Sequence, residues 1–60
     1  MKGFFEIADT RDNTVLIRVS AICSVMVERD ATAIYLLDGN VLRTRESFDL
    51  VKILIRDASE

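Results

Sequence analysis

The sequence contains no histidine and no proline, and it has one cysteine, Cys23. A single cysteine excludes a disulfide within the chain, and without histidine a zinc site of the usual kind has no ligand set. The missing histidine also removes Ser-His-Asp and Cys-His catalytic arrangements, which leaves carboxylates or lysines with strongly shifted pKa values for acid–base chemistry. We therefore expect a protein that is not an enzyme and that holds no metal or other cofactor.

Glycine and long apolar runs are scarce as well. Gly3 and Gly39 are the two glycines, so the glycine-rich loops that hold phosphates in P-loop and dinucleotide-binding proteins are absent. No apolar run is long enough for a signal peptide or a membrane span, and we expect a cytoplasmic protein with no membrane partner. In that reducing setting we interpret Cys23, which lies in an apolar segment, as a small buried hydrophobic residue.

What the chain does contain is typical of a folded domain. Apolar residues make up 50% and charged residues 30% of the 60 positions, and the net charge is −2. That charge weakens any argument for general nucleic-acid affinity. One domain of this size, residues 1–60, has a core that only just offsets chain entropy. With disulfides and zinc excluded, we expect self-assembly to provide the missing stability.

The apolar pattern predicts an antiparallel β meander. A strand over residues 4–8 and a polar turn over residues 9–13 precede a long stretch, residues 15–27, in which every second residue is apolar. Since thirteen residues exceed the usual strand length, we expect a break or bulge near residues 20–22. Polar residues 28–31 then predict a hairpin tip.

The pair Asp38-Gly39, between residues 32–37 and 40–45, is a strong hairpin signal because a type I′ turn requires positive φ at both central residues. A two-residue loop pairs Ile34 with Arg43 and Tyr35 with Leu42, which would make the Tyr35 face the core. The opposite face would have an apolar centre and a basic margin, typical of an interface. The alternative is that the arginine stems merely cover the apolar residues there. This face comprises Ile34, Leu36, Val41, Arg43 and Arg45.

The last segment predicts a helix from Ser47, a good N-cap, to about Asp57, with fraying beyond it. Its apolar residues cover roughly 200° of the helical wheel, whereas a surface helix needs a stripe of about 100°. We expect Leu50 and Ile53 to lie against another chain. Phe48, Val51 and Ile55 would then pack on the domain's own sheet.

Arginines provide the remaining candidate site. Arg43 and Arg45 project from one strand face, and Arg18 would join them if its strand lies nearby. Three guanidinium groups on a sheet could bind phosphate, a nucleotide or an acidic partner. Solvated edge arginines are the simpler interpretation.

Two families are similar to parts of the chain. Thr32, Ile34, Leu36 and Gly39, followed by Glu46-Ser47 at the start of a helix, resemble the small FlbD-like flagellar-operon family. The same hairpin with an Arg-x-Ser helix entry at residues 45–47 resembles the β-rich half of LytTR-type DNA-binding domains. The first resemblance implies a small non-enzymatic protein, and the second implies a DNA reader.

Together these features predict an α+β fold, in which a four-stranded antiparallel meander is followed by one C-terminal helix. We expect a homodimer or higher homo-oligomer, with a role in interaction or regulation in a bacterium or phage, and with another protein as a further potential partner. The alternative is a nucleic-acid or nucleotide binding protein that uses an arginine-lined sheet face.

Overall fold

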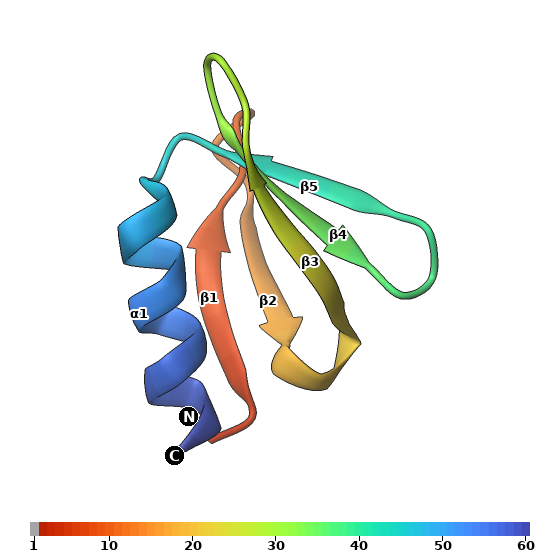
Figure 1. Ribbon diagram of the computed structural model, residues 1–60, viewed down its shortest axis with the longest axis vertical. Coiled ribbons are helices and arrows are strands. Elements are labelled where there is room, and N and C mark those ends of the chain that lie inside the picture. The colour runs from red at the N-terminus through yellow and green to blue at the C-terminus, as the bar shows by residue number, and fades with distance from the viewer. Residues whose placement is uncertain (1) are drawn as a thin grey trace.

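The computed structural model describes residues 2–60. It confirms the α+β class, but the four-stranded meander is wrong, because the chain forms five strands in two antiparallel sheets, β1-β2 and β3-β4-β5 (Figure 1). A 3-10 turn, η1, separates the sheets, and one helix follows them. The elements are β1 (Phe4–Ala8), β2 (Thr14–Arg18), η1 (Val19–Ala21), β3 (Ile22–Val27), β4 (Thr32–Leu36), β5 (Val41–Thr44) and α1 (Phe48–Ser59).

The predicted break in the long alternating stretch is confirmed, and it consists of η1 together with a bulge. The β3–β4 register shifts between Ile22 and Ser24, so Cys23 is the extra residue of the bulge. Cys23 is exposed, which corrects its predicted burial. Beyond the bulge Val25 packs against the core, as Ile17 does before the break, whereas Val27 at the end of β3 is 64% exposed.

The β4–β5 hairpin forms where Asp38-Gly39 predicted it, but the predicted register is wrong. Leu36 N–H donates to the Asn40 carbonyl at 2.9 Å, and Gly39 N–H donates to the Leu36 carbonyl at 3.0 Å. With Gly39 at φ +93°, this is a three-residue loop over residues 37–39. The extra residue moves the pairing by one step and exchanges the two faces of β4, while Leu42 of β5 stays on the core side. Ile34 therefore opposes Leu42 rather than Arg43.

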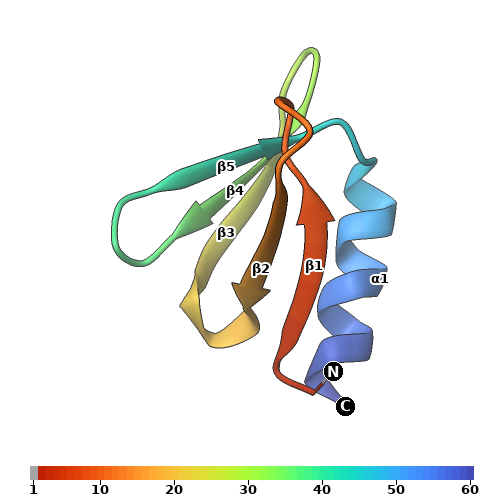
Figure 2. The same cartoon turned by 180° about the vertical axis from the view of Figure 1, so that it is seen from behind.

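The core lies where both sheets meet the helix. Figures 1 and 2 show α1 running alongside β1, at the opposite side of the molecule from the β4–β5 loop. The buried residues come from both hairpins and from α1, so no single element has a core of its own. They are Phe5, Ile7, Ile17, Ile34, Val51 and Ala58.

Both ends of α1 are fixed by hydrogen bonds. The Ser47 hydroxyl accepts from Leu50 N–H at 3.1 Å, which confirms the N-cap. The predicted fraying after Asp57 is wrong, because Ala58 is buried and its carbonyl accepts from Gly3 N–H at 2.6 Å. The N-terminal residues thus hold the last turn. Within residues 2–60, no helix has the length and apolar character needed to cross a membrane.

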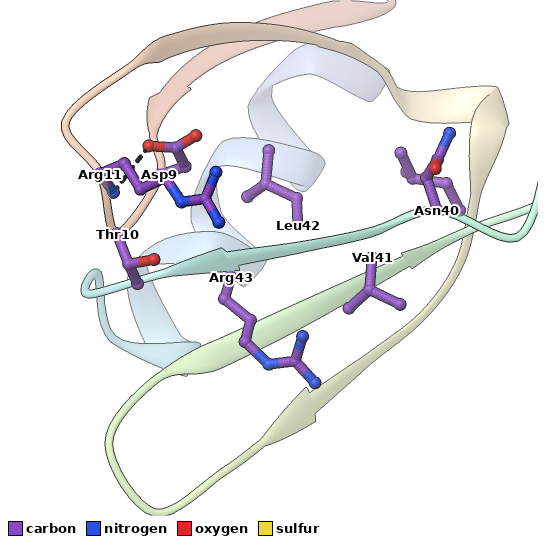
Figure 3. Close-up of a pocket in the computed structure, with 8 residues that line it drawn as sticks. Asp9, Thr10, Arg11, Asn40, Val41, Leu42 and Arg43 are labelled. Atoms are coloured by element: carbon purple, nitrogen blue, oxygen red, sulfur yellow. Dashed lines mark hydrogen bonds between the residues drawn. The ribbon is translucent and has the colours of Figure 1, made fainter.

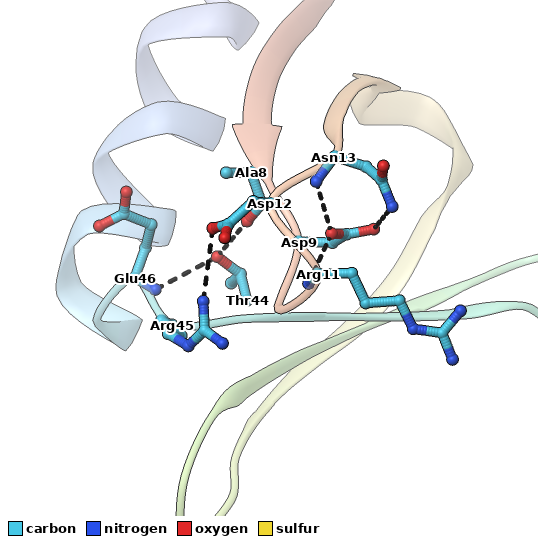
Figure 4. Close-up of polar contacts among 8 residues, drawn as sticks. All are labelled: Ala8, Asp9, Arg11, Asp12, Asn13, Thr44, Arg45 and Glu46. Atoms are coloured by element: carbon cyan, nitrogen blue, oxygen red, sulfur yellow. Dashed lines mark hydrogen bonds and ion pairs between the residues drawn. The ribbon is translucent and has the colours of Figure 1, made fainter.

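Two buried threonines, Thr44 and Thr32, fix the end of the sheets where the chain leaves β5 for α1. Thr44 is 0% exposed, and its hydroxyl donates to the Ala8 carbonyl at 2.8 Å and accepts from Glu46 N–H at 3.2 Å (Figure 4). The Thr32 hydroxyl donates to the Glu46 carbonyl at 2.8 Å. These bonds place the turn between β1 and β2 against the end of β5 and set the path of the chain into α1.

Candidate functional site

The three candidate arginines have three different local partners. Arg18 lies over the Phe4 ring, 5.3 Å from its centroid. Arg43 donates to the Glu28 carboxylate at 2.8 Å and 3.3 Å, and this contact raises the pKa of Arg43. Arg45 lies 3.4 Å from Asp12. Arg18 and Arg43 also line different cavities, so these contacts do not gather the guanidinium groups into one phosphate site.

The hairpin residues predicted to form one interface lie on two faces. Ile34 is fully buried in the core, and Leu36 is half-buried against it. Val41 lies on the outer face of the sheet and is 37% exposed. The one-step register change explains this separation, since it turns even-numbered β4 positions inward. Ile34 consequently offers no surface to a second chain.

The helix divides its apolar residues between the core and the surface. Val51 is fully buried and Ile55 packs against the core, as predicted. Leu50 is half-buried, and Ile53 is 41% exposed. These last two are the residues that we expected to contact another chain, and the monomer leaves both of them outside its core.

A groove lies between α1 and the outer face of the first hairpin. Side chains alternate along β1, so Phe5 and Ile7 face the core while Phe4 and Glu6 face outward. Glu6 pairs with Leu16, which is 51% exposed. The groove has a volume of about 310 Å³, and α1 closes its other side with Leu54, Asp57 and Ala58.

The apolar lining continues from the groove onto the exposed side of α1. Leu50 is one turn before Leu54 on the same flank, and Ile53 lies next to Leu50 farther from the core. We call the apolar residues of the groove together with those of the adjoining flank of α1 the helix–hairpin surface. Its residues are Phe4, Leu16, Leu50, Ile53 and Leu54.

Sequence reasoning missed the strand half of this surface. Three consecutive apolar residues, Val15-Leu16-Ile17, carried the signal, because alternation in a strand with one buried face turns the middle residue outward. The same argument applies to the adjacent pair Phe4 and Phe5.

Charges of opposite sign flank the groove at Phe4. Glu6 and Asp57 line the groove itself. Lys2 and Arg18 line an adjoining hollow of about 470 Å³ that also contacts Phe4. The helix–hairpin surface therefore has an acidic border on one side of Phe4 and a basic border on the other.

A third cavity, of about 460 Å³, lies between the β1–β2 turn and β5 (Figure 3). Asp9 organises the turn by accepting from the N–H groups of Arg11 and Asn13, both at 2.9 Å. The bond from Asn13 N–H is the main reason that the pKa of Asp9 lies below its usual range. Arg11 and Thr10 line the cavity on the turn side.

Within residues 2–60 no group of three or more potential metal-binding side chains occurs. Comparison of the chain with protein-family models, curated proteins and solved structures finds no match. The surfaces themselves are thus the basis for any functional assignment.

Proposed function

We propose that this protein is a non-enzymatic interaction protein that self-assembles through its helix–hairpin surface. The observation that carries the proposal is the exposure of two large apolar side chains near an open groove: Leu16, which is 51% exposed, lines the groove, and Ile53, which is 41% exposed, lies on the solvent side of α1 outside it. Contiguous exposed apolar surface on a small domain is characteristic of an interaction site. A regulatory role would follow from a change in assembly.

A second copy of the chain is the occupant that the charges favour. The groove is acidic at Glu6 and Asp57, and the adjoining hollow beyond Phe4 is basic at Lys2 and Arg18. Two copies related by a two-fold axis, with their grooves antiparallel, would place the acidic border of each beside the basic border of the other. Such a contact would also bury additional apolar surface, of which a 60-residue chain buries little on its own.

Mass in solution tests this proposal. We expect light scattering after gel filtration to give at least twice the 6.8 kDa of one chain at about 100 μM, a concentration typical for weak dimers. Ile53→Asp should reduce the mass to that of the monomer, because a charge would be buried in the contact. Its circular dichroism should stay unchanged, since Ile53 lies outside the core.

Met26→Asp is the matched control. Met26 is 54% exposed, more than Ile53, but it lies on the outer face of the other sheet. This variant should retain the parental mass. A parental protein that remains at 6.8 kDa would refute self-assembly. If only Met26→Asp lost assembly, the chains would associate through the sheet face at Met26 and not through the helix–hairpin surface.

A further inference from the structure

The free edge of β5 presents unpaired main-chain groups. Within residues 2–60, β5 pairs with β4 along one edge only. The bond from Leu36 N–H to the Asn40 carbonyl sets the phase of the ladder. Hydrogen-bonded and non-hydrogen-bonded pairs alternate in an antiparallel sheet, so the main-chain groups of Val41 and Arg43 point away from β4.

One contact already shows that this edge accepts a strand-like hydrogen bond. Thr10 N–H, in the turn between β1 and β2, donates to the Arg43 carbonyl at 2.9 Å. The turn thereby closes the edge at Arg43. This contact leaves three outward main-chain groups unused beside the cavity of about 460 Å³. They are the N–H and the carbonyl of Val41 and the N–H of Arg43. An extended segment could therefore continue the pairing.

Arg11 gives this edge a charge preference. Figure 3 shows the Arg11 guanidinium reaching over β5 toward Leu42. No salt bridge within residues 2–60 engages Arg11. The neighbouring carboxylate of Asp9 is held by the turn through Arg11 N–H, Asn13 N–H and the Asn13 side-chain amide. A carboxylate beside the edge would thus find a partly open cation.

From this geometry we propose that β5 binds an extended acidic segment of a partner protein by strand addition. The segment's backbone pairs with Val41 and with the Arg43 N–H, and a carboxylate side chain on its inner face reaches Arg11. A second copy of this chain fits less well, because its β5 edge would bring a second Arg11 in place of a carboxylate, and its Arg43 and Arg45 already have acidic partners within the chain. This site is separate from the helix–hairpin surface and does not depend on self-assembly.

The probe is a blocked peptide of about eight residues in which valine and glutamate alternate, compared with the same peptide carrying lysine in place of glutamate. In an NMR titration of the full ¹⁵N-labelled chain, we expect the Val41 and Arg43 amide signals to shift and their hydrogen exchange to slow. The glutamate peptide should bind about tenfold more tightly than the lysine peptide, as expected for one charge-assisted contact.

Two matched pairs of variants test the two parts of the contact. Val41→Pro removes the outward N–H but no bond to β4, and proline is tolerated at such an edge position. We expect it to weaken the glutamate peptide about tenfold, whereas Val41→Ala should not. Arg11→Gln should weaken the same peptide severalfold, whereas Arg56→Gln, on α1, should have no effect.

A second peptide tests the edge without altering the protein. N-methylation of alternate valines removes backbone donors from the probe, and it should abolish the shifts at β5. Ile53→Asp should bind the glutamate peptide as the parent does, so failure of self-assembly would leave this test intact. Shifts confined to α1, no shifts at millimolar peptide, or parental affinity in Val41→Pro would each overturn the proposal.

Discussion

At the residue scale, the buried hydroxyl of Thr44 connects elements that no backbone ladder joins. It donates to the Ala8 carbonyl and accepts from Glu46 N–H, and its side chain is 0% exposed. Thr44→Val keeps the shape but leaves both main-chain groups without this partner, so we expect a loss of about 1–3 kcal/mol in the free energy of unfolding. Urea denaturation measures it. Thr14→Val, at an exposed position of β2, should stay within about 0.5 kcal/mol of the parent.

Asp9 adds a dependence on pH at the same scale. Hydrogen bonds from Asn13 and Arg11 lower its pKa in the folded protein. A lowered folded pKa means that Asp9 adds stability above the unfolded value of about 3.9, and that this contribution is lost as the pH falls through the folded pKa. We therefore expect the urea concentration at the unfolding midpoint to fall less between pH 7 and pH 3 in Asp9→Asn than in the parent. In the control Asp30→Asn, in the β3–β4 turn, the midpoint should fall as much as in the parent. An equal decrease in all three proteins would exclude a contribution of Asp9 to the pH dependence of stability.

At the scale of elements, the sequence contained enough information to locate the three hairpin turns, the break before β3 and the start of the helix. Asp38-Gly39 located the hairpin, and Ser47 located the N-cap. The register of the hairpin was not predictable in the same way, because two-residue and three-residue loops both accept glycine at φ above zero. One residue of difference moved Ile34 from the expected interface into the core. It also moved Tyr35 from the expected core face to the outer face, where it pairs with Val41, whereas Leu42 packs against the core as expected.

A pair of truncations checks this register. Ile34 is 0% exposed and Val41 is 37% exposed. We expect Ile34→Ala to cost about 2–5 kcal/mol in the free energy of unfolding, because it leaves a cavity between the sheets and α1. Val41→Ala should cost less than about 1 kcal/mol, since solvent already reaches the side chain. Similar costs for the two variants in urea denaturation would contradict the observed pairing.

At the scale of the whole molecule, the strand count failed for a related reason. The apolar residues at every second position continue through η1, so the pattern alone does not reveal where one sheet ends and the next begins. The bulge at Cys23 then resets which residues face inward. The candidate site shows the same limit, because Leu50 and Ile53 were identifiable from the helical wheel. Phe4 and Leu16 join them only after the first hairpin folds beside α1.

Self-assembly also predicts how the stability of the whole molecule responds to concentration. If folded chains associate through the helix–hairpin surface and unfolded chains do not, association shifts the equilibrium toward the folded state by mass action. For a dimer, we expect Tm to rise by about 3–5 °C for each tenfold increase in protein concentration, given the small unfolding entropy of a 60-residue chain. Differential scanning fluorimetry or circular dichroism over a hundredfold range of about 2–200 μM measures this slope. Ile53→Asp should abolish the slope while Met26→Asp retains it. A parental Tm that is independent of concentration would mean that the fold reaches its stability without a second copy.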